Sequence, residues 1–89
     1  MNRIKSATIN GKKWKWKWEP IDAEDKAVGL CYKTEHEIVI DSNLRGKLML
    51  SAIIHETGHA ADGEASEQEV ERLENAIADV LWRVGYRCK

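Results

Sequence analysis

The sequence predicts one α+β domain in which the strands come first and the helices follow. Its 89 residues suffice for one compact domain and are too few for two. Residues 8–41 contain alternating apolar and polar side chains and a β-branched run, whereas residues 44–85 repeat apolar side chains at helical spacing. Strands followed by helices are typical of the α+β class. We therefore expect residues 1–89 to form a single domain.

The first expected element is a β-hairpin. Asn10 and Gly11 form a dipeptide that is typical of two-residue hairpin turns, and the strictly alternating run K-W-K-W-K-W follows soon after. The alternation places Trp14, Trp16 and Trp18 on one face of a strand and lysines on the other. Because the chain contains no phenylalanine, we expect this tryptophan face to pack into the core. Stacking of nucleic-acid bases on it, or contact with another protein, is a less favoured alternative.

A second pair of strands is expected after an acidic, turn-like segment at residues 20–26. Residues 28–33 and 37–41 have the composition of strands, and the turn between them contains His36. Two hairpins in succession predict a small, mainly antiparallel sheet.

The first helix is expected over residues 44–61. Ser42 or Asn43 can cap its N-terminus, and Asp62 with Gly63 can end it. The apolar residues of this helix predict that it packs on the sheet.

The second helix is expected to run from a capping box to Gly85. Ser66 and Glu69 have the spacing of that box. Apolar residues then recur with helical periodicity at Val70, Leu73, Ile77, Leu81 and Val84.

Charge and hydropathy disfavour several classes of protein. Fourteen lysine and arginine residues against fifteen acidic residues give a formal net charge of −1, which is unlike a nucleic-acid binder or a membrane-surface protein. Basic residues nevertheless concentrate in residues 1–18 and acidic residues in 62–79. The chain has no apolar run long enough for a membrane span and no secretory signal, so we expect a cytoplasmic protein. Cys31 and Cys88 are expected to be unpaired thiols.

The sequence His55-Glu56-Thr57-Gly58-His59 is an H-E-x-x-H motif within the first expected helix. Histidines four residues apart project from one helix face, about 5–6 Å apart, so both imidazoles can bind one Zn²⁺. Glu56 lies beside such a metal without binding it. Its carboxylate can accept a proton from an attacking water and deliver it to a leaving amine. The motif therefore predicts a zinc site with Glu56 as the catalytic residue.

The third metal ligand is not determined by this motif. A catalytic zinc usually has three protein ligands, and the acidic residues that follow the motif are the candidates. Glu67 and Glu74 border the apolar stripe of the second helix, whereas Glu71 lies further towards solvent. The spacing leaves all three open. His36 is expected to be an ordinary surface histidine in a turn.

The motif and the residues after it resemble the ImmA/IrrE-like zinc peptidases. The likeness rests on the motif itself, followed by Glu67-Gln68-Glu69-Val70-Glu71-Arg72-Leu73, which is similar to the HExGH and E-x-x-A-x-x-F pattern of that family. The segments T-I-N-G-K-K-W, E-I-V-I-D and V-L-W-R-V-G-Y-R also resemble small phage-encoded and prophage-encoded metallopeptidases. The resemblance implies a minimal zincin-like domain with Glu67 as the third zinc ligand. Seven residues separate His59 from Glu67, fewer than in the larger peptidases.

The sequence thus predicts a zinc-dependent metallopeptidase with one Zn²⁺ per chain and a peptide or protein substrate. The expected metal ligands are His55, His59 and Glu67, and the expected compartment is the host cytoplasm if the chain is phage-encoded. The alternative is a non-catalytic accessory or binding domain that zinc stabilises. In that case a fourth ligand, either His36 or a cysteine, closes the site. The sequence does not predict the cleavage specificity or the oligomeric state.

Overall fold

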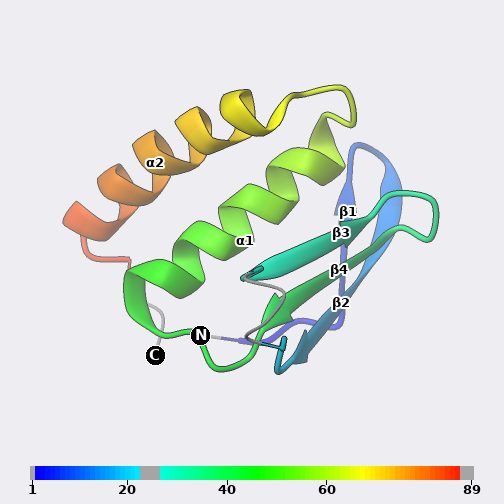
Figure 1. Ribbon diagram of the computed structural model, residues 1–89, viewed down its shortest axis with the longest axis horizontal. Helices are drawn as coiled ribbons and strands as arrows, with labels where there is room; N and C mark the ends of the chain where they lie inside the picture. The colour runs from blue at the N-terminus through cyan, green and yellow to red at the C-terminus, as the bar shows by residue number, and fades with distance from the viewer. Residues whose placement is uncertain (1, 23–26, 87–89) are drawn as a thin grey trace.

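The computed structural model describes residues 2–22 and 27–86, which form a sheet and two helices (Figure 1). The strands precede the helices along the chain, so the predicted α+β class is confirmed. Residues 23–26 of the expected turn-like segment, and Cys88, lie outside the described residues. The elements are β1 Ser6–Ile9, β2 Lys12–Glu19, β3 Gly29–Tyr32, β4 Glu37–Asp41, α1 Gly46–Ala61 and α2 Glu67–Arg83.

The predicted N-terminal hairpin is confirmed. Strands β1 and β2 pair antiparallel, and Asn10 and Gly11 between them both have positive φ angles, 50° and 80°. Positive φ at both central residues is the mark of the tight turn that suits a twisted hairpin. Trp14 and Trp16 are buried, at 4% and 7% exposure, and Trp18 is partly buried against the same cluster. The tryptophan face therefore belongs to the core, and its two buried rings cannot stack on bases.

The sheet is mixed, which is a correction to the mainly antiparallel sheet that two hairpins suggested. The strand order is β1-β2-β4-β3, and the central pair β2 and β4 runs parallel, while the two outer pairs are antiparallel. Strand β4 is central because Ile38, Val39 and Ile40 are all buried, with exposures of 0%, 4% and 0%. A strand that is apolar on both faces is typical of a sheet interior.

Helix α1 begins at Gly46, and the predicted N-cap at Ser42 or Asn43 is wrong. Arg45 occupies the cap position without a side-chain cap bond. The preceding residues form a turn of their own, because a side-chain oxygen of Asp41 accepts a hydrogen bond from the Asn43 backbone N–H at 3.0 Å. Such local side-chain bonds compete with helix formation.

Helix α2 starts as its capping box predicts. The Ser66 side chain accepts a hydrogen bond from the Glu69 backbone N–H at 3.1 Å. The helix ends at Arg83, and Gly85 follows with a φ of +101°.

The layers of the molecule are the sheet, α1 and α2, in that order (Figure 1). Within the described residues α2 packs against α1 alone, so only α1 covers the sheet. The main core lies between them and consists of Trp14, Trp16, Ile38, Ile40, Met49 and Ala52. Neither described helix combines the length and the apolar character needed to cross a membrane.

Candidate metal centre

Three side chains of the two helices converge where α2 begins. His55 and His59 come from α1 and Glu67 from the first turn of α2. The two Nε2 atoms lie 3.2 Å apart, and the Glu67 carboxylate oxygens lie 2.6 Å from Nε2 of His59 and 3.2 Å from Nε2 of His55. Among the described residues these three form a group that could hold a metal ion, with ligand atoms all within 4.8 Å of one another.

The geometry of this group fits Zn²⁺. Zinc binds imidazole nitrogen and carboxylate oxygen at about 2.0–2.2 Å, so neighbouring ligand atoms of a tetrahedral site are about 3.3 Å apart. The two Nε2 atoms are 3.2 Å apart, and each contacts a different oxygen of the Glu67 carboxylate: His55 contacts Oε2 at 3.2 Å and His59 contacts Oε1 at 2.6 Å. The shorter contact needs to widen by less than 1 Å. Two imidazoles and one carboxylate are also a donor set of known catalytic zinc sites.

Gly58, in the middle of the motif, allows α2 to approach α1 closely. A Cβ atom at this position would lie 3.2 Å from a methyl carbon of Val70. Glycine inside a helix costs about 1 kcal/mol relative to alanine, so a specific packing role is needed to offset it. Val70 lies less than one helical turn after Glu67, so the same close approach brings the Glu67 carboxylate to the histidines. The H-E-x-x-H spacing alone leaves the residue at position 58 unspecified.

Glu74 contacts the Nδ1 edge of the His55 imidazole, whereas the three-residue group lies at the Nε2 edge. Its carboxylate is 2.7 Å from Nδ1 of His55, and both side chains are mostly buried. A proton on Nδ1 is donated to this carboxylate, which leaves the Nε2 lone pair directed at the group. Glu71, the remaining candidate, is exposed and lies outside the group.

Opposing effects act on the pKa of His55. Burial lowers it, whereas the hydrogen bond with Glu74 and the charges of nearby carboxylates, Glu56 among them, raise it. The net result is a pKa above the usual value. The imidazole therefore sits in a strongly acidic surrounding, which also attracts a cation.

Glu56 is the buried acid of the site, with 5% exposure. Burial raises its pKa to about 7, and the charges of Glu67 and Glu74 act in the same direction against the opposing effect of His55. The backbone of β3 packs directly on this side chain, because a Cβ atom at Gly29 would lie 2.8 Å from Cγ of Glu56. Only glycine leaves room for the carboxyl group here, a constraint that no motif signals.

A cleft of about 490 Å³ contains the group and Glu56. Residues 27–31, which include most of β3, form one wall together with Lys33, and the helices form the other. Cys31 lies in the β3 wall as a free thiol, and burial together with the charge of Glu56 raises its pKa. His36 lies outside the group, in the turn between β3 and β4 where it was expected, and its partly exposed ring packs on Trp14 with ring centroids 5.0 Å apart.

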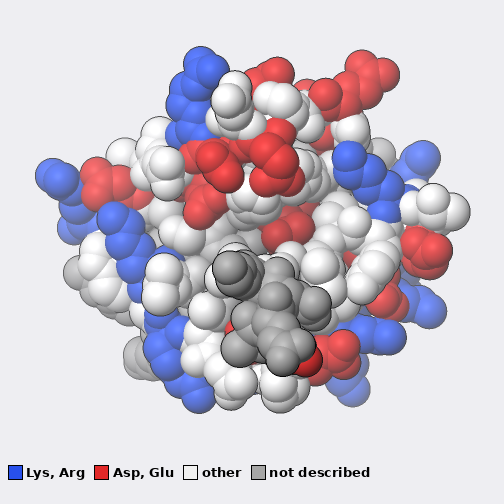
Figure 2. All heavy atoms as spheres, viewed as in Figure 1, with Lys and Arg blue, Asp and Glu red and all other residues white. Residues whose placement is uncertain are grey.

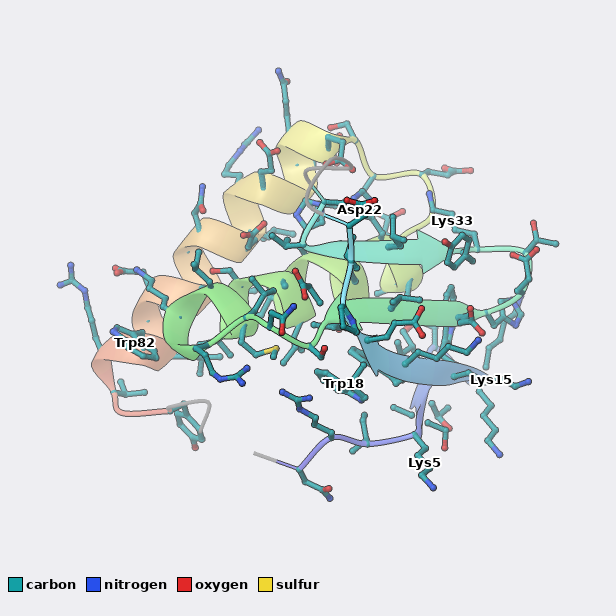
Figure 3. The ribbon with its side chains drawn as sticks, turned by 60° about the horizontal axis from the view of Figure 1, so that its bottom comes forward. Lys5, Lys15, Trp18, Asp22, Lys33 and Trp82 are labelled. Carbon is teal, nitrogen blue, oxygen red and sulfur yellow. The ribbon has the colours of Figure 1, made fainter. Side chains whose placement is uncertain are left out.

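The uneven distribution of acidic and basic residues along the sequence gives the molecule an acidic side and a basic side. Acidic side chains gather over α2 on the face shown in Figure 2. Lys5 and Lys15, on the N-terminal hairpin, point away from the body of the molecule (Figure 3). The acidic side thus contains the candidate metal centre, and the basic side is the outer part of the sheet.

No protein-family model matches this chain, and no curated protein or solved structure is significantly similar to it. The resemblance to the ImmA/IrrE-like peptidases therefore rests on the motif and the segments quoted from the sequence.

Proposed function

We propose that this protein is a zinc-dependent metallopeptidase of the zincin-like type, with one Zn²⁺ per chain. The observation that carries the proposal is the convergence of His55, His59 and Glu67, with the buried Glu56 in the same cleft. The resemblance of the motif to the ImmA/IrrE-like peptidases supports it.

Each side chain has a role in the proposed reaction. Zn²⁺ in this group would supply Lewis acidity and lower the pKa of a water molecule. Glu56 takes the proton of the attacking water and passes it to the leaving amine. Glu74 holds His55 in the orientation that ligation requires.

The cleft suits an extended peptide as substrate. Strand β3 is at the edge of the sheet, and residues 28–31 line the cleft. An edge strand offers unpaired backbone groups to which a peptide can add as a further strand. The scissile bond would then lie between β3 and the helices, beside Glu56.

The alternative of a closed, structural zinc site has less support. That alternative assigned the fourth ligand to His36 or a cysteine, and in the described part of the chain neither His36 nor Cys31 belongs to the group. An open fourth position is characteristic of catalytic zinc, whereas structural sites are closed by four protein ligands.

Metal content tests the first half of the proposal. Protein purified without chelator should contain about one zinc per chain, and chelator should lower its melting temperature, because the three ligands join two helices. Elemental analysis that finds no stoichiometric transition metal would contradict this.

Peptide cleavage tests the second half. Glu56→Gln should retain the zinc and the fold but lose about 10²–10⁴-fold in the rate of peptide hydrolysis, since glutamine cannot accept the proton. Glu71→Gln is the matched control, because Glu71 is exposed and lies outside the group. A peptide library cleaved equally fast by the parent and by Glu56→Gln would rule out the mechanism.

A further inference from the structure

Helix α2 carries an apolar stripe that faces solvent instead of α1. We call it the α2 seam, and its residues are Leu73, Ile77, Val80 and Val84. Their exposures are 60%, 43%, 59% and 65%, which is high for four large apolar side chains on one helix. The successive spacings of four, three and four residues are those of a coiled-coil stripe. The buried face of α2, which contains Val70 and Ala78, is a different one.

The α2 seam borders an apolar groove of about 520 Å³ between the two helices. This groove is separate from the candidate metal centre, because His55, Glu56 and His59 line the other cleft. Its apolar walls are Leu50, Ile53 and Ile54 from α1 and Leu73, Ile77 and Leu81 from α2.

We propose that this face binds a second copy of the chain, with the two α2 helices antiparallel about a two-fold axis. The α2 seam and the groove are adjacent on one surface and share Leu73 and Ile77, so a two-fold rotation can place each α2 seam against the groove of the other copy. Such self-complementarity is the requirement for a symmetric dimer. A chain of 89 residues has a small core, and association is a common way to bury additional apolar surface.

The charges beside the seam determine the orientation. Glu69 and Arg83 are two heptads apart, so they flank the α2 seam along the same edge. An antiparallel pair centred near Ala76 brings Glu69 of one copy beside Arg83 of the other, at both ends of the interface. A parallel pair lacks this contact, because the edge that carries Glu69 in one copy then faces the opposite edge of α2 in the other copy. Antiparallel helix dipoles also attract each other.

The size of the face predicts a weak dimer. A helix of 17 residues is about 25 Å long, and two helices side by side are about 20 Å wide, so the face covers on the order of 500 Å² per copy. Stable pairs bury about 800 Å² per partner. We therefore expect a dissociation constant in the micromolar range and a mixture of monomer and dimer.

Sedimentation equilibrium of the full chain as purified, from low micromolar to near millimolar concentration, tests the proposal. The mass should rise from that of a monomer to that of a dimer and no further. A monomer at every concentration, or growth beyond the dimer, would overturn it.

Substitutions locate the interface. Ile77→Lys should weaken dimerisation at least tenfold, whereas Leu48→Lys should leave it unchanged, since Leu48 is 67% exposed but does not line the groove. Circular dichroism and thermal melting check that both variants fold. Unchanged dimerisation of folded Ile77→Lys would contradict the proposal.

Charge reversal tests the orientation without altering the apolar surface. Arg83→Glu should weaken the dimer, and the double variant Glu69→Lys with Arg83→Glu should restore it, because the two reversed charges again face each other across the interface. Failure of the double variant to recover would overturn the antiparallel arrangement. Metal binding should be the same in Ile77→Lys, Leu48→Lys and Arg83→Glu, since none of these residues belongs to the three-ligand group.

Discussion

The Nδ1 atom of His55 lies 2.7 Å from a carboxylate oxygen of Glu74, while Nε2 of the same ring lies 3.2 Å from Glu67. One imidazole thus contacts two carboxylates of α2 that are seven residues, or about two helical turns, apart. Glu67 is exposed and faces the candidate metal position, whereas Glu74 is mostly buried behind the ring. The two acids therefore have different roles, ligation and orientation.

Removal of the orienting carboxylate should weaken metal binding without abolishing it. We expect Glu74→Ala to lower zinc affinity about 10–100-fold, the usual effect of losing a hydrogen-bond partner of a ligating histidine. Glu74→Gln should retain most of the affinity, because its amide oxygen still accepts the Nδ1–H bond. Competition with a chelator of known affinity measures both. Equal losses in the two variants would mean that Glu74 acts through packing or charge and does not orient His55.

Removal of the candidate third ligand should have a larger effect. Glu67→Ala leaves two histidines, so zinc affinity should fall by more than about 100-fold, beyond the range for an orienting residue. Because Glu67 is exposed, the stability of the metal-free protein should change little. Glu71→Ala is the control and should bind zinc like the parent. If Glu67→Ala also binds zinc like the parent, the third ligand lies elsewhere.

Local signals in the sequence predicted the elements whose structure depends on a few neighbouring residues. Asn10 with Gly11 specified the first turn, and Ser66 with Glu69 specified the start of α2. The H-E-x-x-H spacing likewise placed two imidazoles on one face of α1, because four residues make about one helical turn. The parallel pairing of β2 with β4 was not predictable in this way, since alternation defines the faces of a strand but not its neighbours.

The choice among the acids of α2 also depended on tertiary structure. Glu67 and Glu74 both border the apolar stripe, and only the crossing of the two helices decides which of them meets the Nε2 atoms. That crossing depends on the contact of Gly58 with Val70, which no local pattern encodes. The contact of Gly29 with Glu56 is non-local in the same sense.

Alanine in place of Gly29 should displace the catalytic candidate and leave the metal group intact. The added methyl would lie 2.8 Å from Cγ of Glu56 and 2.9 Å from one of its carboxylate oxygens, so that side chain must move. We expect zinc affinity within a few-fold of the parent and a rate of peptide hydrolysis at least tenfold lower.

Gly63→Ala is the matched control for this variant, because the nearest atom to its added methyl is the Lys33 side chain at 4.0 Å. It should behave like the parent in both assays. A Gly29→Ala variant with parental hydrolysis would show that Glu56 can move without consequence, which contradicts its role in positioning a proton.

The raised pKa of Glu56 predicts how the stability of the metal-free protein depends on pH. The carboxyl titrates at about 7 in the folded state and at 4.5 in the unfolded chain, so between these values the folded state binds more protons. Stability contributed by the protonated form is therefore lost as pH rises through this window, by on the order of 2–3 kcal/mol. The raised pKa of His55 acts in the same direction at higher pH, because its protonated form is also favoured by folding.

Urea unfolding in chelator at a series of pH values measures the loss of stability. Glu56→Gln cannot ionise, so the fall between pH 4.5 and 7 should be smaller in this variant by the Glu56 contribution, and the variant should be the more stable of the two at pH 7. Parallel stability curves for parent and variant would mean that Glu56 is not held protonated by burial.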